Sequence, residues 1–149
     1  MTKILASLLT LILVGTASSQ SSWKTYHHPN GFSITLPPYF KKGLVVAAGT
    51  LQYFDDTRSD SVTLTVESFG HPGEIKADYE NYVTKTFSGV TYKIFKDSWY
   101  VFSGEDELGI YYNKTIIRAG VQQHLTIRYP RSLKFEMDTI VGKIASSFN

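Results

Sequence analysis

Four histidines carry most of the acid–base chemistry that this sequence could support: His27, His28, His71 and His124. A zinc site needs three or four converging ligands, but the chain has no cysteine, and His27 and His28 would point to opposite faces of a strand. The sequence also lacks the GxSxG, HExxH, GxxxxGK[ST] and GxGxxG motifs. We therefore interpret the histidines as strand-end and loop residues, and we expect neither a metal site nor a cofactor.

Two acidic clusters, residues 55–60 and residues 105–107, could attract calcium. Neither has the alternating ligands, central glycine and distal glutamate of an EF-hand loop, and Arg58 neutralises part of the first cluster. Solvated acidic turns are the interpretation that we prefer. Whether either loop binds calcium stays open at this stage.

A stronger group of polar and aromatic residues follows from the pairing of two predicted strands. If Ala119-Gly120 forms a two-residue turn, then every second residue of the flanking strands shares one face of the sheet. The facing pairs are then Ile117 with Gln122, Thr115 with His124, Asn113 with Thr126, and Tyr111 with Arg128. Tyr100 and Phe102 extend this face from the preceding strand. The predicted ligand-binding residues are Tyr100, Tyr111, Asn113, Thr115, His124, Thr126 and Arg128.

This face supports two hypotheses of different classes. As a binding surface, its aromatic rings would stack on a small polar ligand or an envelope protein while its polar groups fix orientation. As a hydrolase site, His124 would act as general base beside Arg128 as an anion clamp, because histidine titrates near neutral pH. The first requires a shallow exposed face and the second a pocket, and burial of His124 under a helix would count against both. We favour the non-catalytic module, since no motif places a nucleophile or a metal.

The opposite face of the same strands is predicted to be the core. It carries Tyr112, Ile116, Val121, Leu125 and Ile127. Lys114 and Gln123 are polar exceptions in this apolar row.

The strands and helices that position these residues can be predicted from the spacing of apolar residues along the chain. A hairpin is predicted over residues 23–36 with Asn30-Gly31 at its reversal, followed by strands at 44–48, 51–54 and 62–67. Helical spacing predicts one amphipathic helix over residues 75–87. Strands at 90–96, 99–103, 110–118 and 121–129 follow, and an apolar stripe over residues 137–148 predicts a C-terminal helix. The order is typical of an α+β domain, an antiparallel sheet flanked by helices.

Residues 1–19 read as a secretory signal peptide, with Lys3 followed by an apolar run and then small residues. Residues 20–149 are enough for one domain, which we expect to be periplasmic or secreted. No later segment is apolar enough to insert in a membrane. The net charge of +2 and the absence of long basic runs argue against nucleic-acid binding.

The strand starts and turns resemble those of the PsbP-like α/β/α sandwich superfamily. The resemblance is carried by Trp23-x-x-Tyr26, by Gly31-Phe32-Ser33-Ile34 with Pro37, and by the closing hairpin from Tyr111-Tyr112 to Tyr129-Pro130 before the last helix. That group includes the PsbP subunit of the photosynthetic oxygen-evolving complex and many small secreted bacterial proteins of unknown role. The resemblance implies the sandwich fold and a non-catalytic, accessory binding role, and it implies no site residue.

Overall fold

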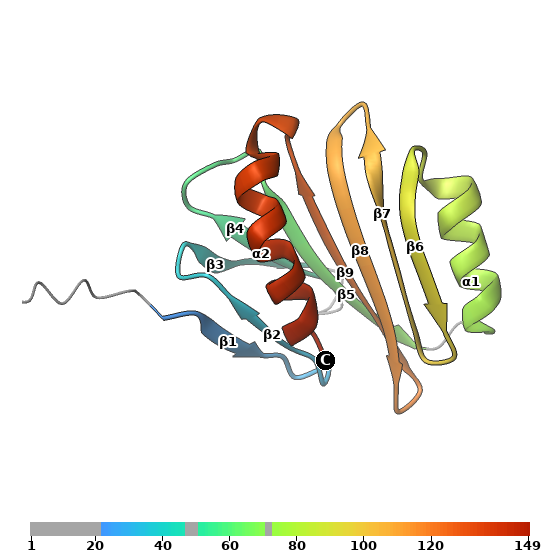
Figure 1. Ribbon diagram of the computed structural model, residues 1–149. Helices are drawn as coiled ribbons and strands as arrows, with labels where there is room; N and C mark the ends of the chain where they lie inside the picture. Colours follow the sequence, from blue (N-terminus) through green and yellow to red (C-terminus); the bar gives the residue numbers. More distant parts are fainter. Residues whose placement is uncertain (1–21, 47–50, 71–72) are drawn as a thin grey trace, which may run out of the picture.

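The computed structural model describes residues 22–46, 51–70 and 73–149. Two sheets and two main helices make up this part of the chain (Figure 1). The strands are β1 (Lys24–His27), β2 (Ser33–Leu36), β3 (Phe40–Val46), β4 (Leu51–Asp56), β5 (Thr63–Gly70), β6 (Val90–Lys96), β7 (Trp99–Asp106), β8 (Gly109–Arg118) and β9 (Val121–Tyr129). The helices are α1 (Ile75–Asn81), the π-helix η2 (Tyr82–Thr86), the 3-10 turn η3 (Arg131–Leu133) and α2 (Lys134–Ser147).

The N-terminal hairpin forms as the sequence predicts. β1 and β2 pair antiparallel, and Gly31 takes the positive φ of 88° that the reversal between them needs. This small sheet is tied to the other end of the chain: Ser33 and Asn149 exchange two backbone hydrogen bonds, and the Thr35 N–H donates to Ser147 Oγ at 2.8 Å. The hairpin therefore lies beside the C-terminal end of α2 (Figure 1).

The large sheet is antiparallel throughout, with the strand order β3-β4-β5-β9-β8-β7-β6. β9 returns to the centre and pairs with β5, so the meander β6–β9 adds its strands to the edge opposite β3 and β4. Ala119 and Gly120 form the two-residue turn between β8 and β9, with φ values of 50° and 76°. The predicted strand pairing is confirmed at all four facing pairs.

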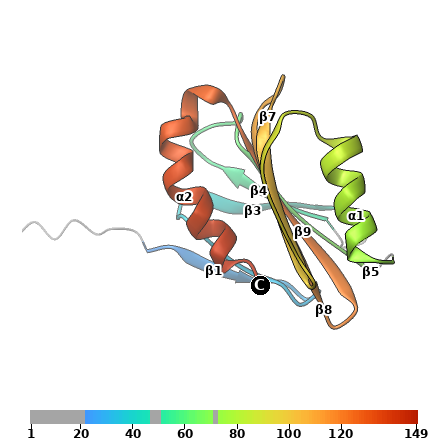
Figure 2. The ribbon, with the colours of Figure 1, turned by 45° about the vertical axis from the view of Figure 1, so that its right-hand side comes forward.

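One helix covers each face of the large sheet, which confirms the predicted flanked architecture (Figures 1 and 2). On one face α2 packs on the hairpin and the central strands, burying Leu125 and Ile127 together with Met137 and Ile144. On the other face α1 and η2 pack mainly on the outer strands β6, β7 and β8. Neither helix in the part of the chain that the structure describes combines the length and apolarity needed to span a bilayer.

Several element boundaries differ by a few residues from the sequence prediction; β5 and β7, for example, extend to Gly70 and Asp106 rather than to residues 67 and 103. The helix predicted over residues 75–87 is α-helical only to Asn81 and continues as the π-helix η2. β3 begins at Phe40 rather than at residue 44. Lys41 and Lys42 are exposed on this edge strand, where charge is common, and they conceal the strand pattern. The signal-peptide segment 1–19 and residues 47–48 of the strand predicted over 44–48 lie outside the described residues.

Candidate functional site

The polar–aromatic face predicted from the strand register is assembled as expected but is not exposed. α1 and η2 cover it with an apolar and aromatic stripe: Ile75, Tyr79, Tyr82, Val83 and Phe87. Tyr100, Tyr111 and Thr115 beneath them are 0% exposed, and Asn113 and His124 are also buried. Strand alternation gives the residues that share a face but does not reveal whether a short helix covers them. The expectation of an open binding face here is therefore corrected, and the face is a packing interface.

His124 lies in a hydrogen-bond network under α1. Its Nδ1 is 3.0 Å from Thr115 Oγ1, and its Nε2 is 2.7 Å from the Gln122 amide nitrogen. The same amide and the Tyr100 hydroxyl both donate to Asp78 Oδ2 on α1. With Gln122 donating, Nε2 of His124 is an acceptor and the ring is neutral.

Burial sets the protonation state of this histidine. It lowers the pKa of His124 to about 4, although the Asp78 carboxylate 4.0 Å away acts in the opposite direction. A general base with such a low pKa, covered by a helix, is poorly suited to catalysis at neutral pH. The predicted hydrolase role of His124 thus has no support in this geometry.

Thr126 and Arg128 lie at the half-buried margin of the same face. Thr126 Oγ1 donates to Asn113 Oδ1 at 2.8 Å. Arg128 makes a two-pronged ion pair with Asp106, at 2.6 and 3.0 Å, and this pair lowers the pKa of the carboxyl. The guanidinium also lies 5.4 Å from the centre of the Tyr111 ring. Arg128 is engaged within the fold rather than presented as an anion clamp.

The acidic clusters are likewise engaged in ion pairs. Asp56 is buried and binds Arg58, which also pairs with Glu136 of α2. Glu105 of the second cluster pairs with Arg131. Within residues 22–46, 51–70 and 73–149, no group of three or more His, Asp or Glu side chains could hold a metal ion. His28 stacks on the Phe32 ring at 4.6 Å, and His71 lies outside the described residues.

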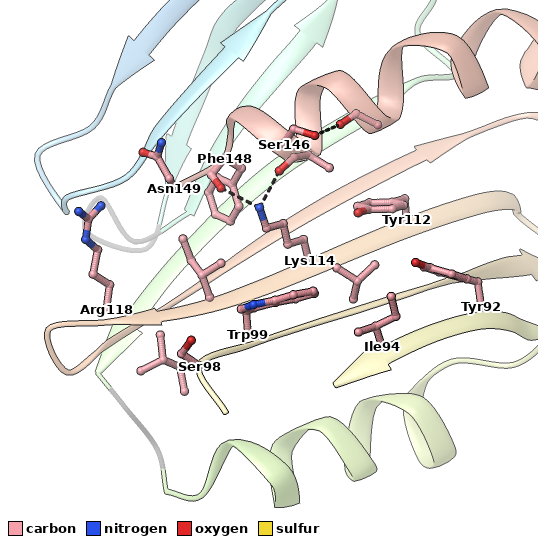
Figure 3. Close-up of a pocket in the computed structure, with 15 residues that line it drawn as sticks. Tyr92, Ile94, Ser98, Trp99, Tyr112, Lys114, Arg118, Ser146, Phe148 and Asn149 are labelled. Atoms are coloured by element: carbon pink, nitrogen blue, oxygen red, sulfur yellow. Dashed lines mark hydrogen bonds between the residues drawn. The ribbon is translucent and has the colours of Figure 1, made fainter. Parts of the chain in front are cut away.

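A cavity of about 770 Å³ opens on the other face, between the C-terminal half of α2 and the outer strands β6, β7 and β8 (Figure 3). We call it the α2 groove. It exists because α2 crosses the hairpin and the central strands and leaves the outer strands uncovered (Figure 1). The residues that line it are Tyr92, Ile94, Ser98, Trp99, Val101, Tyr112, Lys114, Ile116, Ile117, Arg118, Gly142, Ala145, Ser146, Phe148 and Asn149.

The floor of the α2 groove is a regular array of side chains from three strands. Trp99 lies opposite Ile116, and Val101 lies opposite both Ile94 and Lys114. Because alternate residues share a face, the aromatic and aliphatic groups of these strands all project toward α2. Trp99 lies near the middle of the floor, between the two ends of the groove (Figure 3). This array offers a flat apolar surface on which a ring can stack.

The wall contributed by α2 is built from small residues. Gly142 and Ala145 face the groove, and a Cβ atom added at Gly142 would meet nothing within 4 Å. Larger side chains at these positions would fill the space between helix and sheet. The groove thus depends on small residues along one side of α2.

Lys114 explains one of the polar exceptions in the predicted core row. Its Nζ donates to the backbone oxygens of Ala145 at 2.7 Å and Phe148 at 2.9 Å, where α2 ends (Figure 3). A cation at this position satisfies carbonyls that the helix leaves unpaired and complements the helix dipole. Burial lowers the pKa of the amine. Gln123, the second exception, donates to the backbone oxygen of Asn30.

Sequence reasoning overlooked the α2 groove, although Lys114 was a signal for it. A lysine in an otherwise apolar row indicates either an unusual partner or an opening in the core, and here both are present. Trp99, Tyr92 and Arg118 gave no comparable signal, because the sequence does not reveal how far α2 extends across the sheet.

No family model matches the chain, and no curated protein matches it. Among solved structures, it is similar to the solution structure of cyanobacterial PsbP (CyanoP) from Synechocystis sp. PCC 6803. The TM-score is 0.66 with 14% sequence identity, over 95% of this chain and 98% of that chain. The fold is PsbP-like. The expected sandwich architecture is thereby confirmed, and at this level of identity the similarity concerns the fold alone.

Within this PsbP-like sandwich the two faces of the sheet differ in access. The α1 face is filled by side chains, while the α2 face combines a packed core over the central strands with the open groove over β6 to β8. The α2 groove is therefore the candidate functional site.

Proposed function

We propose that this chain is an exported, non-catalytic binding module that takes a small ligand in the α2 groove. The observation that carries the proposal is the cavity itself: about 770 Å³, floored by aromatic and aliphatic side chains with a few polar groups. Cavities of this size and composition are typical of small-molecule sites. The signal-peptide pattern of residues 1–19 supports export to the periplasm or beyond the cell.

The composition of the lining favours binding over catalysis. Among the described residues that line the groove there is no aspartate, glutamate or histidine, the side chains most often used for general acid–base chemistry near neutral pH. His124, the predicted general base, lies on the opposite face under α1. The accessory role expected from the PsbP-like resemblance agrees with a module that binds without transforming its ligand.

A ligand-retention experiment tests this proposal. The purified full chain is incubated with a small-molecule extract, separated from unbound material and examined by native mass spectrometry. We expect the wild type to retain a ligand and Gly142→Leu to lose it, because the added side chain extends into open space in the groove. Thr139→Leu, which adds the same side chain to α2 outside the lining, is the matched control and should retain the ligand.

Two results would contradict the proposal. Equal retention by wild type and Gly142→Leu would mean that the ligand binds elsewhere. Ester hydrolysis that His124→Gln abolishes would favour the hydrolase instead.

A further inference from the structure

We infer that the ligand of the α2 groove is a small organic anion, a flat apolar body that carries one carboxylate. The inference rests on the proposed function and specifies the chemistry of that site. Three observations support it: the charge of the lining, the position of its cations relative to Trp99, and the helix end that borders it.

The side chains that line the groove carry a positive charge in the part of the chain that the structure describes. They include Lys114 and Arg118 and no acidic side chain. Arg58, Arg128 and Arg131 each pair with a carboxylate, whereas Arg118 has no ion pair with any residue in the described ranges. An exposed arginine at the end of an apolar groove is suited to bind the carboxylate of a ligand through both of its nitrogens.

The cations lie on either side of the best stacking surface. Lys114, Ile116 and Arg118 project from the same face of β8, and Trp99 is the cross-strand neighbour of Ile116. A ring stacked on Trp99 would thus lie between the two cations. Lys96 pairs with Trp99 from β6 and shares its face by strand alternation. The Lys114 amine uses two of its three N–H groups on α2, which leaves one for the ligand.

The helix end argues for a single negative charge. The groove borders the C-terminal part of α2, where the helix dipole is negative and Lys114 already offsets it. Among the described residues that line the cavity there is no helix N-terminus and no glycine-rich loop, the backbone features that usually cradle phosphate. A carboxylate is therefore favoured over a doubly charged phosphate.

Three naphthalene probes test the inference on the full chain: 2-naphthoate, the neutral 2-naphthalenemethanol, and 2-naphthyl phosphate. Amide chemical shifts in ¹H–¹⁵N spectra report both site and affinity. We expect 2-naphthoate to shift amides of β6, β7, β8 and the end of α2, and to bind at least about 5-fold more tightly than either of the other probes. Arg118→Ala should weaken naphthoate binding about 5- to 10-fold and leave the affinity for the alcohol unchanged.

Lys93→Ala is the matched control. It removes the same charge from β6 but on the α1 side, since Phe95, two residues along, packs against Tyr79. Naphthoate binding should be unchanged in this variant. Equal affinity for naphthoate and the alcohol, or tighter binding of the phosphate, would overturn the carboxylate assignment while leaving the groove as the site. If no probe shifts amides of the groove, both the inference and the groove proposal fail.

Discussion

Strands β7 and β8 form a closed packing interface on one face of the sheet and the floor of an open groove on the other. The α1 face holds the residues with the richest chemistry, yet it is closed by aromatic packing and a hydrogen-bond network around Asp78, Gln122 and His124. The α2 face is the more apolar of the two, yet it holds a cavity of about 770 Å³. Access to the sheet is thus decided by how much of each face its helix covers, not by the polarity of the face.

The buried network on the α1 face should tolerate substitution less well than the groove floor. Hydrogen bonds join side chains of β7, β8, β9 and α1 in this network, which makes it costly to disturb because a buried group that loses its partner keeps its desolvation penalty. The groove floor borders open space, so its side chains can change with less effect on the fold. Apart from Lys114, side chains of the groove floor should therefore matter more for binding than for stability, whereas the buried side chains of the α1 face should matter for stability.

Two adjacent residues test this division most directly. Tyr100 is fully buried on the α1 side and Trp99 is half-buried on the groove floor. We expect Tyr100→Ala to lower the free energy of unfolding by about 3–5 kcal/mol, through lost packing and the lost bond to Asp78. Trp99→Ala should cost less than half as much and abolish ligand retention. Urea unfolding gives both values, and equal losses would contradict the comparison.

A second prediction concerns pH. Burial lowers the pKa of His124 to about 4, below its ordinary value of 6.5, so the unfolded chain binds this proton more readily than the folded one. The stability from the neutral ring is complete above pH 6.5 and is lost as pH falls toward 4. The loss amounts to about 3 kcal/mol.

Urea unfolding at several pH values between 7 and 4.5 measures this slope. In His124→Gln the slope should flatten, since the titrating group is gone. Asp106 and Asp138, whose carboxyl pKa values are lowered by Arg128 and Lys134, contribute chiefly below this range. An unchanged slope in the variant would assign the pH dependence to other groups.

A third prediction concerns the groove wall. Lys114→Met removes two hydrogen bonds from a charged donor to the end of α2, so we expect a loss of about 1.5–3 kcal/mol. Amide hydrogen exchange should accelerate in α2 and in β2, which is hydrogen-bonded to the last residues of the chain. Lys93→Met, an exposed lysine on the same sheet, should change neither quantity.

The smallest expected effect is a gain. Gly142→Ala should raise the free energy of unfolding by about 0.5–1 kcal/mol, because alanine favours the helix and its methyl group meets nothing within 4 Å. Thermal unfolding measures the change. A loss of stability would indicate that the groove closes against Gly142 in solution.

Much of the sheet could be predicted because short turns and alternation constrain it. The Ala119-Gly120 turn determined the register of β8 and β9, and through it the two faces of the central strands. The alternation of residues along the strands does not reveal where a helix packs on the sheet. Tyr79, Tyr82 and Val83 mark a helix with one apolar side, but nothing in their spacing assigns that side to Tyr100 and His124 rather than to another surface.

The candidate site was harder to predict for the same reason. The groove forms where the face of the sheet extends beyond the strands that α2 covers. Neither the extent of the sheet nor the position of the helix on it is a local property of the sequence. Lys114 could have directed attention to the α2 face, since a cation in an apolar row needs acceptors. Arg118 and Trp99 could not, because an exposed arginine and a strand tryptophan are common in any sheet.

The pairing of Ser33 and Thr35 with Asn149 and Ser147 also bears on the order in which the molecule assembles. These partners are 112 to 116 residues apart, so the loop-closure entropy of bringing them together is best offset once the large sheet has already formed. The hairpin β1–β2 would therefore dock late in folding, although it comes first in the chain. Until then Phe32, Ile34 and Leu36 would stay exposed to water, and the folding intermediate would be most prone to aggregate at this apolar edge.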